Sequence, residues 1–217
     1  MATNVKGRGI RVEVATTLAA AVTAGATAIT LANPGVVTDA SHGLANNTVG
    51  FWNTMVGMEQ LEDQAFRVKN QTTDTFEMQG LDTSAFTAFT SGTYQVATAW
   101  STLAESTAYS IPDASTEDLD ATTLLDVIDV IDSGNLAAQP INFGNMLLRE
   151  TPSAALTYLQ NAALAGTKVL LRITLQGGGI RIYYGTPSAP GEDVQAKQLG
   201  RASVSVKGRG RLLKLAA

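Results

Sequence analysis

A succession of short β-strand signals dominates the first half of this chain. Apolar and polar residues alternate over short segments, and Gly, Asn or Asp residues separate one segment from the next. Strands at a spacing of about ten residues with such turns are typical of antiparallel β structure. The segments are 28–31, 36–38, 48–52, 64–69, 75–78 and 92–97. The pattern predicts a compact antiparallel β module over residues 17–97.

The second half is also predicted to be mainly β. Apolar residues alternate over 168–175, and the glycine-rich turn 176–179 leads into a second alternating segment at 180–185, which predicts a hairpin. Residues 5–15 and 198–206 have the same alternation and predict a first and a closing strand.

One segment is predicted to be helical. Thr151 is a good N-cap, Pro152 suits the first helical turn, and Gly166 supplies a stop. Apolar residues between them repeat with helical spacing, so we expect one α-helix at about 152–165, lying against a sheet. The acidic stretch 117–132 fits either a helix or an extended loop, and we favour a long loop with local structure.

Charge is unevenly distributed along the chain. The pentapeptide Val-Lys-Gly-Arg-Gly occurs at 5–9 and again at 206–210, and the carboxy-terminal region is rich in Lys and Arg. In contrast, no Lys or Arg occurs between Lys69 and Arg149, where acidic residues accumulate. This separation suits head-to-tail contact between copies, in which an acidic surface meets a basic one. The alternative is that the two basic segments are simply solvated strand ends.

The residues favour no catalytic or cofactor chemistry. There is no cysteine and only one histidine, His42, which we expect to stabilise a turn. The glycines at 177–179 lie between two strands and lack the partners of a phosphate loop. Asp126, Asp129 and Asp132 could ligate a hard cation, but their spacing lacks the features of a calcium loop, so we expect solvated carboxylates. We therefore expect neither an enzyme nor a bound metal or cofactor.

The sequence has no apolar run long enough to cross a membrane and no signal-peptide pattern at its amino end. We expect a protein without membrane insertion, made in a cytoplasm-like compartment.

Four segments together resemble the major tail tube protein of long, non-contractile-tailed bacteriophages. They are residues 5–14, residues 108–113 leading into the acidic stretch, the start of the predicted helix at 151–152, and the hairpin end at 181–185. The resemblance covers about residues 4–15 and 98–215. The intervening module, with its Ser-His-Gly-Leu segment at 41–44, resembles small β domains inserted in various phage tail proteins.

The resemblance implies a mainly β fold: a tail-tube β-sandwich or barrel made by 1–16 and 98–217, with the helix on its flank, and an inserted β domain at 17–97 on the outer surface of the tube. It implies a structural virion protein whose homohexameric rings stack by helical assembly into a tube for DNA ejection. The implied partners are a tape-measure protein in the lumen, a tail terminator, distal tail or baseplate proteins, and double-stranded DNA that passes without sequence-specific binding. Assembly would take place in the host cytoplasm.

Candidate contacts between subunits and rings follow from the charge pattern and the resemblance. They are Lys6, Arg8, Asp113, Glu117, Asp118, Asp120, Lys207, Arg209 and Arg211. One competing function is a stand-alone carbohydrate- or cell-surface-binding β protein, for which exposed aromatic residues in the inserted module would be the sign. The other is a hydrolase, which a sequence with one histidine and no recognisable nucleophile motif does not favour.

Overall fold

The computed structural model describes residues 9–20, 25–113, 116–120, 131–136, 139–196, 198–208 and 210–216. Over these residues the protein is mainly antiparallel β with one α-helix, which confirms the predicted fold class. Thirteen strands belong to one continuous sheet, and two further strands form a separate ribbon.

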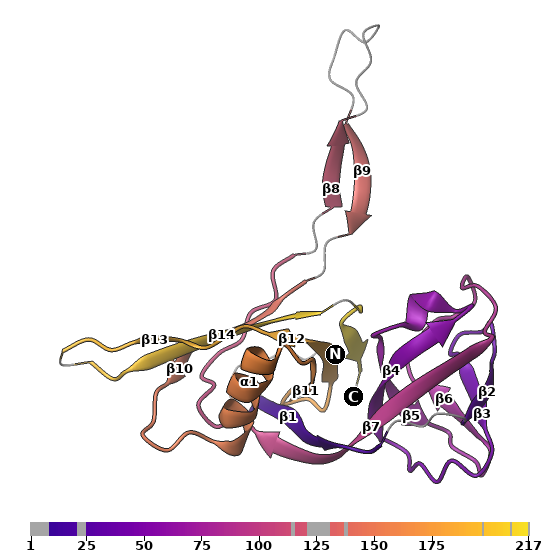
Figure 1. Cartoon of the computed structure of the whole chain (residues 1–217), viewed down its shortest axis with the longest axis horizontal. Helices are drawn as coiled ribbons and strands as arrows, with labels where there is room; N and C mark the ends of the chain where they lie inside the picture. The colour runs from indigo at the N-terminus through magenta and orange to yellow at the C-terminus, as the bar shows by residue number, and fades with distance from the viewer. Residues whose placement is uncertain are drawn as a thin grey trace, which may run out of the picture.

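The large sheet runs through both halves of the chain in the order β10-β14-β12-β11-β1-β7-β4-β5-β6-β3-β2, with β13 and β15 at its side (Figure 1). Its strands are β1 (Arg11–Leu18), β2 (Ala26–Ile29), β3 (Val36–Asp39), β4 (Val49–Val56), β5 (Ala65–Lys69), β6 (Thr75–Met78), β7 (Ser91–Thr102), β10 (Ile141–Leu147), β11 (Val169–Thr174), β12 (Ile180–Pro187), β13 (Gly191–Asp193), β14 (Arg201–Gly208) and β15 (Leu213–Leu215). The hairpin predicted at 168–185 is the β11–β12 pair.

Helix α1 (Ala154–Ala165) covers one face of the core sheet. Its buried residues pack against apolar side chains of β1, β11 and β12, among them Val14, Leu171 and Tyr183. The helix ends at Gly166, which adopts a positive φ of 65°, as the sequence predicts.

The predicted N-cap, Thr151, is wrong by two residues. Ser153 caps the helix instead, and its Oγ accepts a hydrogen bond from the Leu156 amide at 3.2 Å. A tertiary contact selects this residue, because the buried carboxylate of Glu105 accepts hydrogen bonds from the Ser153 amide and hydroxyl, both at 2.6 Å. Sequence spacing alone could not reveal that contact.

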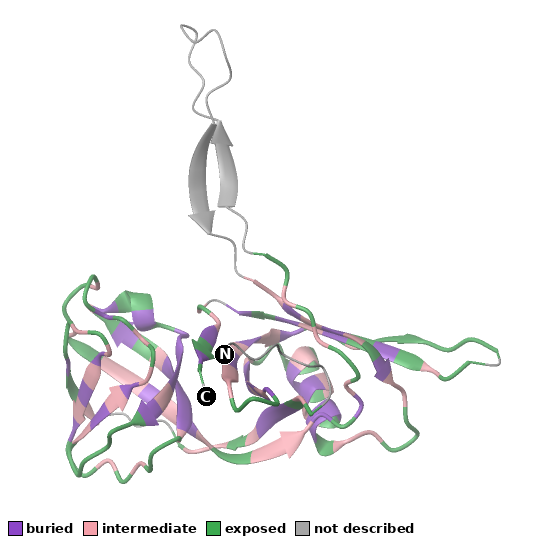
Figure 2. Cartoon of the chain, turned by 180° about the vertical axis from the view of Figure 1, so that it is seen from behind, coloured by how far each residue is buried: buried purple, intermediate pink, exposed green. Residues whose placement is uncertain are grey.

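The strands of residues 26–96 wrap around a second hydrophobic core (Figure 2). Four aromatic side chains form its centre: Trp52, Phe66, Phe76 and Tyr94, each at most 1% exposed. Strand β2, at the end of the strand order, lies close to β7, so the sheet curls back on itself. A short 3-10 helix, η1 (Glu59–Leu61), lies on this half.

Two long strands connect the halves. β1 pairs with β11 on one side and with β7 on the other, and β7 continues into pairing with β4. The domain boundaries predicted at residues 16/17 and 97/98 fall inside β1 and β7. The halves are therefore joined by paired strands rather than by loops.

A third hydrophobic core fills the joint between the halves. It combines Phe51 and Ala65 of the inserted half, residues 17–97, with residues of β11, β12 and β15. These lie on the face of the core sheet opposite α1. The ring of Phe51 stacks on Tyr184 with centroids 3.8 Å apart. Lys168 Nζ lies 2.6 Å from the buried carboxylate of Asp63, which adds an ion pair between the halves.

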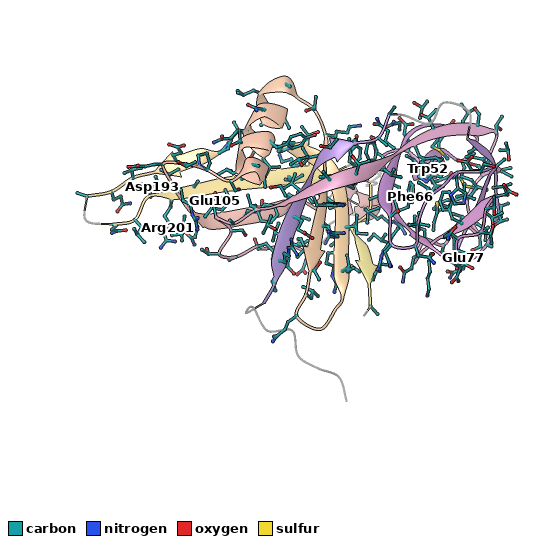
Figure 3. All side chains as sticks on the ribbon, turned by 90° about the horizontal axis from the view of Figure 1, so that it is seen from below. Trp52, Phe66, Glu77, Glu105, Asp193 and Arg201 are labelled. Atoms are coloured by element: carbon teal, nitrogen blue, oxygen red, sulfur yellow. The ribbon has the colours of Figure 1, made fainter. Side chains whose placement is uncertain are left out.

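The carboxy-terminal strands make a long arm, in which β13 and β10 pair with opposite edges of β14. β14 pairs with β12 and β13 in turn, so the arm extends past the rest of the core to the turn at 194–200 (Figure 1). Asp193 and Arg201 lie near its far end (Figure 3). Val194 and Leu199 in this turn are each 71% exposed.

Candidate assembly surfaces

An acidic ribbon projects from the core. Strands β8 (Thr116–Asp120) and β9 (Ile131–Leu136) pair antiparallel, with Leu119 opposite Asp132, and form a two-stranded sheet of their own. The ribbon extends away from the body of the molecule (Figure 1). Between residues 116 and 136 the sequence has six carboxylates and no Lys or Arg. The stretch expected to be a loop therefore has strands at both ends; its middle, 121–130, lies outside the described residues.

The ribbon is anchored by polar contacts at its base. Gln139 donates a hydrogen bond from its side-chain nitrogen to the Pro112 carbonyl at 2.9 Å. Ser110 and Asn142 exchange two backbone hydrogen bonds just below, of 2.8 and 2.9 Å. Residues 105–110 shield the outer edge of β10. The Leu147 amide donates to the Glu105 carbonyl, and the Thr107 hydroxyl donates to the Asn145 carbonyl. This cover blunts an edge that would otherwise be open to pairing.

The predicted contact residues are distributed over separate parts of the chain. Asp113, near the base of the ribbon, and Lys207 and Arg211 are exposed. Glu117, Asp118 and Asp120 lie on β8. The predicted contacts Lys6, Arg8 and Arg209 lie outside the described residues, as do the aspartates 126 and 129.

Two residues of the carboxy-terminal pentapeptide, Val206 and Gly208, are buried, and Lys207 between them is exposed. Val206 is fully buried, and Gly208 donates its amide to the Tyr183 hydroxyl at 2.7 Å. A Cβ at position 208 would lie 2.6 Å from the Tyr183 ring, so only glycine fits there. The same phenol donates to the Gln139 carbonyl, which ties β12 to the base of the ribbon.

The residues that follow the pentapeptide are held in the joint. Gln64 accepts a hydrogen bond from the Arg211 amide at 2.8 Å and donates one to the Arg211 carbonyl at 3.0 Å. Leu213 and Leu215 of β15 are each 4% exposed and belong to the third core. The basic carboxy-terminal region thus presents its charged side chains from a backbone that is fixed in the subunit.

Two cations outside the set of candidate contacts lie side by side in the sheet. Arg181 on β12 and Lys214 on β15 are directly opposite in the strand register. Lys214 is exposed and Arg181 is half-buried. The alternation at 180–185 predicted a strand there, and the similar alternation at 211–215 was a signal for a second one, but their pairing is decided only by the fold.

A separate group of charged side chains at the joint forms ion pairs within the subunit. Arg172 donates from Nε to Glu13 Oε2 at 2.9 Å, and its guanidinium lies 4.3 Å from the centroid of the Trp100 ring. Arg11 pairs with the other oxygen of Glu13 at 3.0 Å. These contacts are structural, because the carboxylate is buried and both of its oxygens are engaged.

The described residues hold no group of three or more His, Asp or Glu arranged to bind a metal ion. His42 accepts a hydrogen bond from the Leu44 amide at Nδ1 (3.0 Å), so its Nε2 carries the proton and donates to the Thr75 carbonyl at 3.2 Å. The ring also packs edge-on against Phe76. This is the turn-stabilising role predicted for it.

Aromatic side chains offer no exposed stacking platform. All thirteen Phe, Trp and Tyr residues of the chain are among those described, and each is buried or half-buried. A concave site of about 400 Å³ lies between the start of β1 and residues 102–109, and Tyr109 is the one aromatic residue that lines it.

These features define an antiparallel β protein with two projecting ribbons and segregated charge. A scan of the chain against protein-family models finds no match, and neither does a search of the curated proteins. Within the described segments, no helix has the length and apolar character needed to cross a membrane.

Proposed function

We propose that the protein is the subunit of a self-assembling tube, of the kind that forms the tail of long, non-contractile-tailed bacteriophages. Copies associate through heterologous contacts into hexameric rings, and the rings stack into a conduit for DNA delivery. Heterologous contacts leave a free surface at each end, so assembly along the tube axis continues by repetition.

The observation that carries the proposal is the projecting acidic ribbon. An isolated two-stranded hairpin is marginally stable at best in water. β8 and β9 pair only with each other among the described strands, and they extend away from the subunit's own cores. The sequence of residues 116–136 has six carboxylates and no Lys or Arg, so this segment has a net negative charge that opposes its own compaction. A neighbouring copy that covers the ribbon and supplies cations would remove both costs.

The inserted half is proposed to lie on the outside of the tube. It covers the face of the core sheet opposite α1 through the third hydrophobic core and the Lys168–Asp63 ion pair. A domain of this size, fixed to one side of the sheet, would obstruct a narrow lumen.

The remaining partners follow from the proposed class. A tape-measure protein would occupy the lumen during assembly in the host cytoplasm, and terminator and distal tail proteins would close the two ends of the virion's tail tube. Acidic surfaces repel the phosphate backbone, so double-stranded DNA would pass without adhering. The proposal assigns no catalysis and no cofactor to the chain.

A carbohydrate- or cell-surface-binding role has less support. Such sites commonly use exposed aromatic rings, and the large aromatic side chains of the inserted half, Trp52, Phe66, Phe76 and Tyr94, are buried together in its core.

Negative-stain electron microscopy of the concentrated protein tests the proposal. We expect rings or tubes of constant diameter, with sedimentation velocity showing large species that increase with protein concentration. A matched variant replaces residues 114–138 by two glycines; the Gln139–Pro112 hydrogen bond shows that the ends to be joined are close. This variant should keep the wild-type circular dichroism and remain monomeric. A wild-type protein that stays monomeric at all concentrations would contradict the proposal.

A further inference from the structure

Arg181 and Lys214 form a like-charge pair within the sheet. They are directly opposite on the antiparallel strands β12 and β15, and therefore share one face. Like charges in this position destabilise a sheet. An anionic partner bound at the pair would relieve this repulsion.

The strand positions around the pair offer it no carboxylate. The next residue across the sheet from Arg181 is Ile173 on β11, and the next beyond that is Val12 on β1, both buried. Arg181 Nη1 donates to the carbonyls of Ile180 and Leu215, at 3.2 and 3.4 Å. Neither cation takes part in the ion pairs found among the described residues.

The described amino end of the chain lies beside this region. Gly9 lies against Gln176 in the turn between β11 and β12, at the end of the sheet where Arg181 and Lys214 pair.

We propose that Arg181 and Lys214 bind the acidic ribbon, residues 116–136, of a second copy of this chain. The inference rests on the proposed self-assembly and names the contact. Charge complementarity selects the occupant, because the ribbon has six carboxylates and no cation. A copy's own ribbon is a poor candidate, since it projects away from the body that contains β12 and β15 (Figure 1). Each copy has one ribbon and one cationic pair, so the contact is heterologous and repeats.

A charge-swap experiment on the full chain tests this contact. The cation variant is R181E/K214E, and the ribbon variant is E117K/D118K/D120K/D132K. Each alone should weaken association, measured by sedimentation velocity at low salt, by about tenfold or more. The chain that combines all six substitutions should associate again, because a ribbon made basic then meets a pair made acidic in every copy.

Two further variants guard against misfolding and non-specific charge effects. K214E alone changes only an exposed side chain and should still weaken association. K69E/R149E changes the charge by the same amount as R181E/K214E, at two exposed cations outside the candidate contacts, and should leave association within about twofold of wild type. Circular dichroism and the urea midpoint of each variant establish that it is folded.

The outcomes separate this inference from the tube proposal. Tubes that form equally well with R181E/K214E or K214E would overturn the contact and leave the tube proposal standing. Association that these variants abolish and the combined chain restores, but that never yields rings or tubes, would support the contact and contradict the tube. Failure of the combined chain to regain association, while it remains folded, would also overturn the contact. A wild-type protein that does not associate at any salt concentration would overturn both.

Discussion

At the scale of single residues, the buried carboxylates of this protein are structural. Glu105 holds the first turn of α1 through Ser153, and Glu13 holds Arg172 against Trp100. Asp39 accepts a hydrogen bond from the Tyr94 hydroxyl in the core of the inserted half. Each has a partner in the fold that satisfies its charge or hydrogen-bonding capacity, which is how a core accommodates such groups.

Tyrosine ionisation should limit the alkaline stability of the protein. Burial raises the pKa of Tyr94, and the bond to Asp39 raises it further; burial also raises the pKa of Tyr184, with Asp63 adding to the effect. The folded protein thus retains protons that the unfolded chain releases above its ordinary value of 10.0. The free energy of unfolding should therefore be constant just below pH 10 and fall as the pH rises beyond it.

The variant Tyr94→Phe isolates this effect. At pH 7 it should lower the free energy of unfolding by about 1–3 kcal/mol, because Asp39 loses a donor. Above pH 10 its decline with pH should be shallower than that of wild type by about 1.4 kcal/mol per pH unit. Urea unfolding at pH 7, 10 and 11 measures both, and an unchanged alkaline slope would contradict the assignment.

At the scale of elements, two ribbons differ in how they are supported. β8 and β9 form a sheet of their own, whereas the β13–β14 arm is continuous with the core through β12. This contrast explains why the acidic ribbon is the element proposed to need a neighbour. It also changes the interpretation of the basic carboxy-terminal region, whose backbone lies in the joint between the halves.

Removal of residues 209–217 should destabilise the subunit itself. Leu213 and Leu215 fill the third core, and the loss of two buried leucines should cost about 4 kcal/mol or more. Hydrogen exchange should increase in the inserted half around Gln64, where Arg211 is bound. Removal of residues 216–217 alone should change neither measurement. A 209–217 deletion with a wild-type urea midpoint would show that the segment is only a docking tail.

At the scale of the whole molecule, the two halves share strands and a core. β1 and β7 pass from one half to the other, and Phe51 stacks on Tyr184 across the joint. Few contacts usually cross a boundary between independent domains. The prediction that residues 17–97 are an inserted domain on the outer surface stays a prediction. In unfolding, the two halves should behave as one cooperative unit.

Differential scanning calorimetry of the unassembled protein checks this expectation. A single transition, with equal calorimetric and van't Hoff enthalpies, is expected. The measurement belongs at low protein concentration, where assembly does not contribute. Two transitions with separate midpoints would show that the inserted half unfolds independently.

Local pattern was enough to predict most of the elements. Alternation and turn residues indicated the strands of the inserted half and the β11–β12 hairpin within a few residues, because side-chain direction in a strand has a period of two. The spacing of apolar residues indicated α1 and its end at Gly166. The acidic stretch had no clear period, so its two paired strands were missed.

By itself, the sequence determined the mainly β class, the single helix, the absence of cysteine chemistry and the segregation of charge. Only the tertiary structure decided which distant residues meet: Ser153 with Glu105, Gln64 with Arg211, and Arg181 with Lys214. The reason is physical. Strand and helix periods are properties of neighbouring residues, whereas strand pairing across a sheet depends on the packing of the whole chain, and no local pattern encodes it.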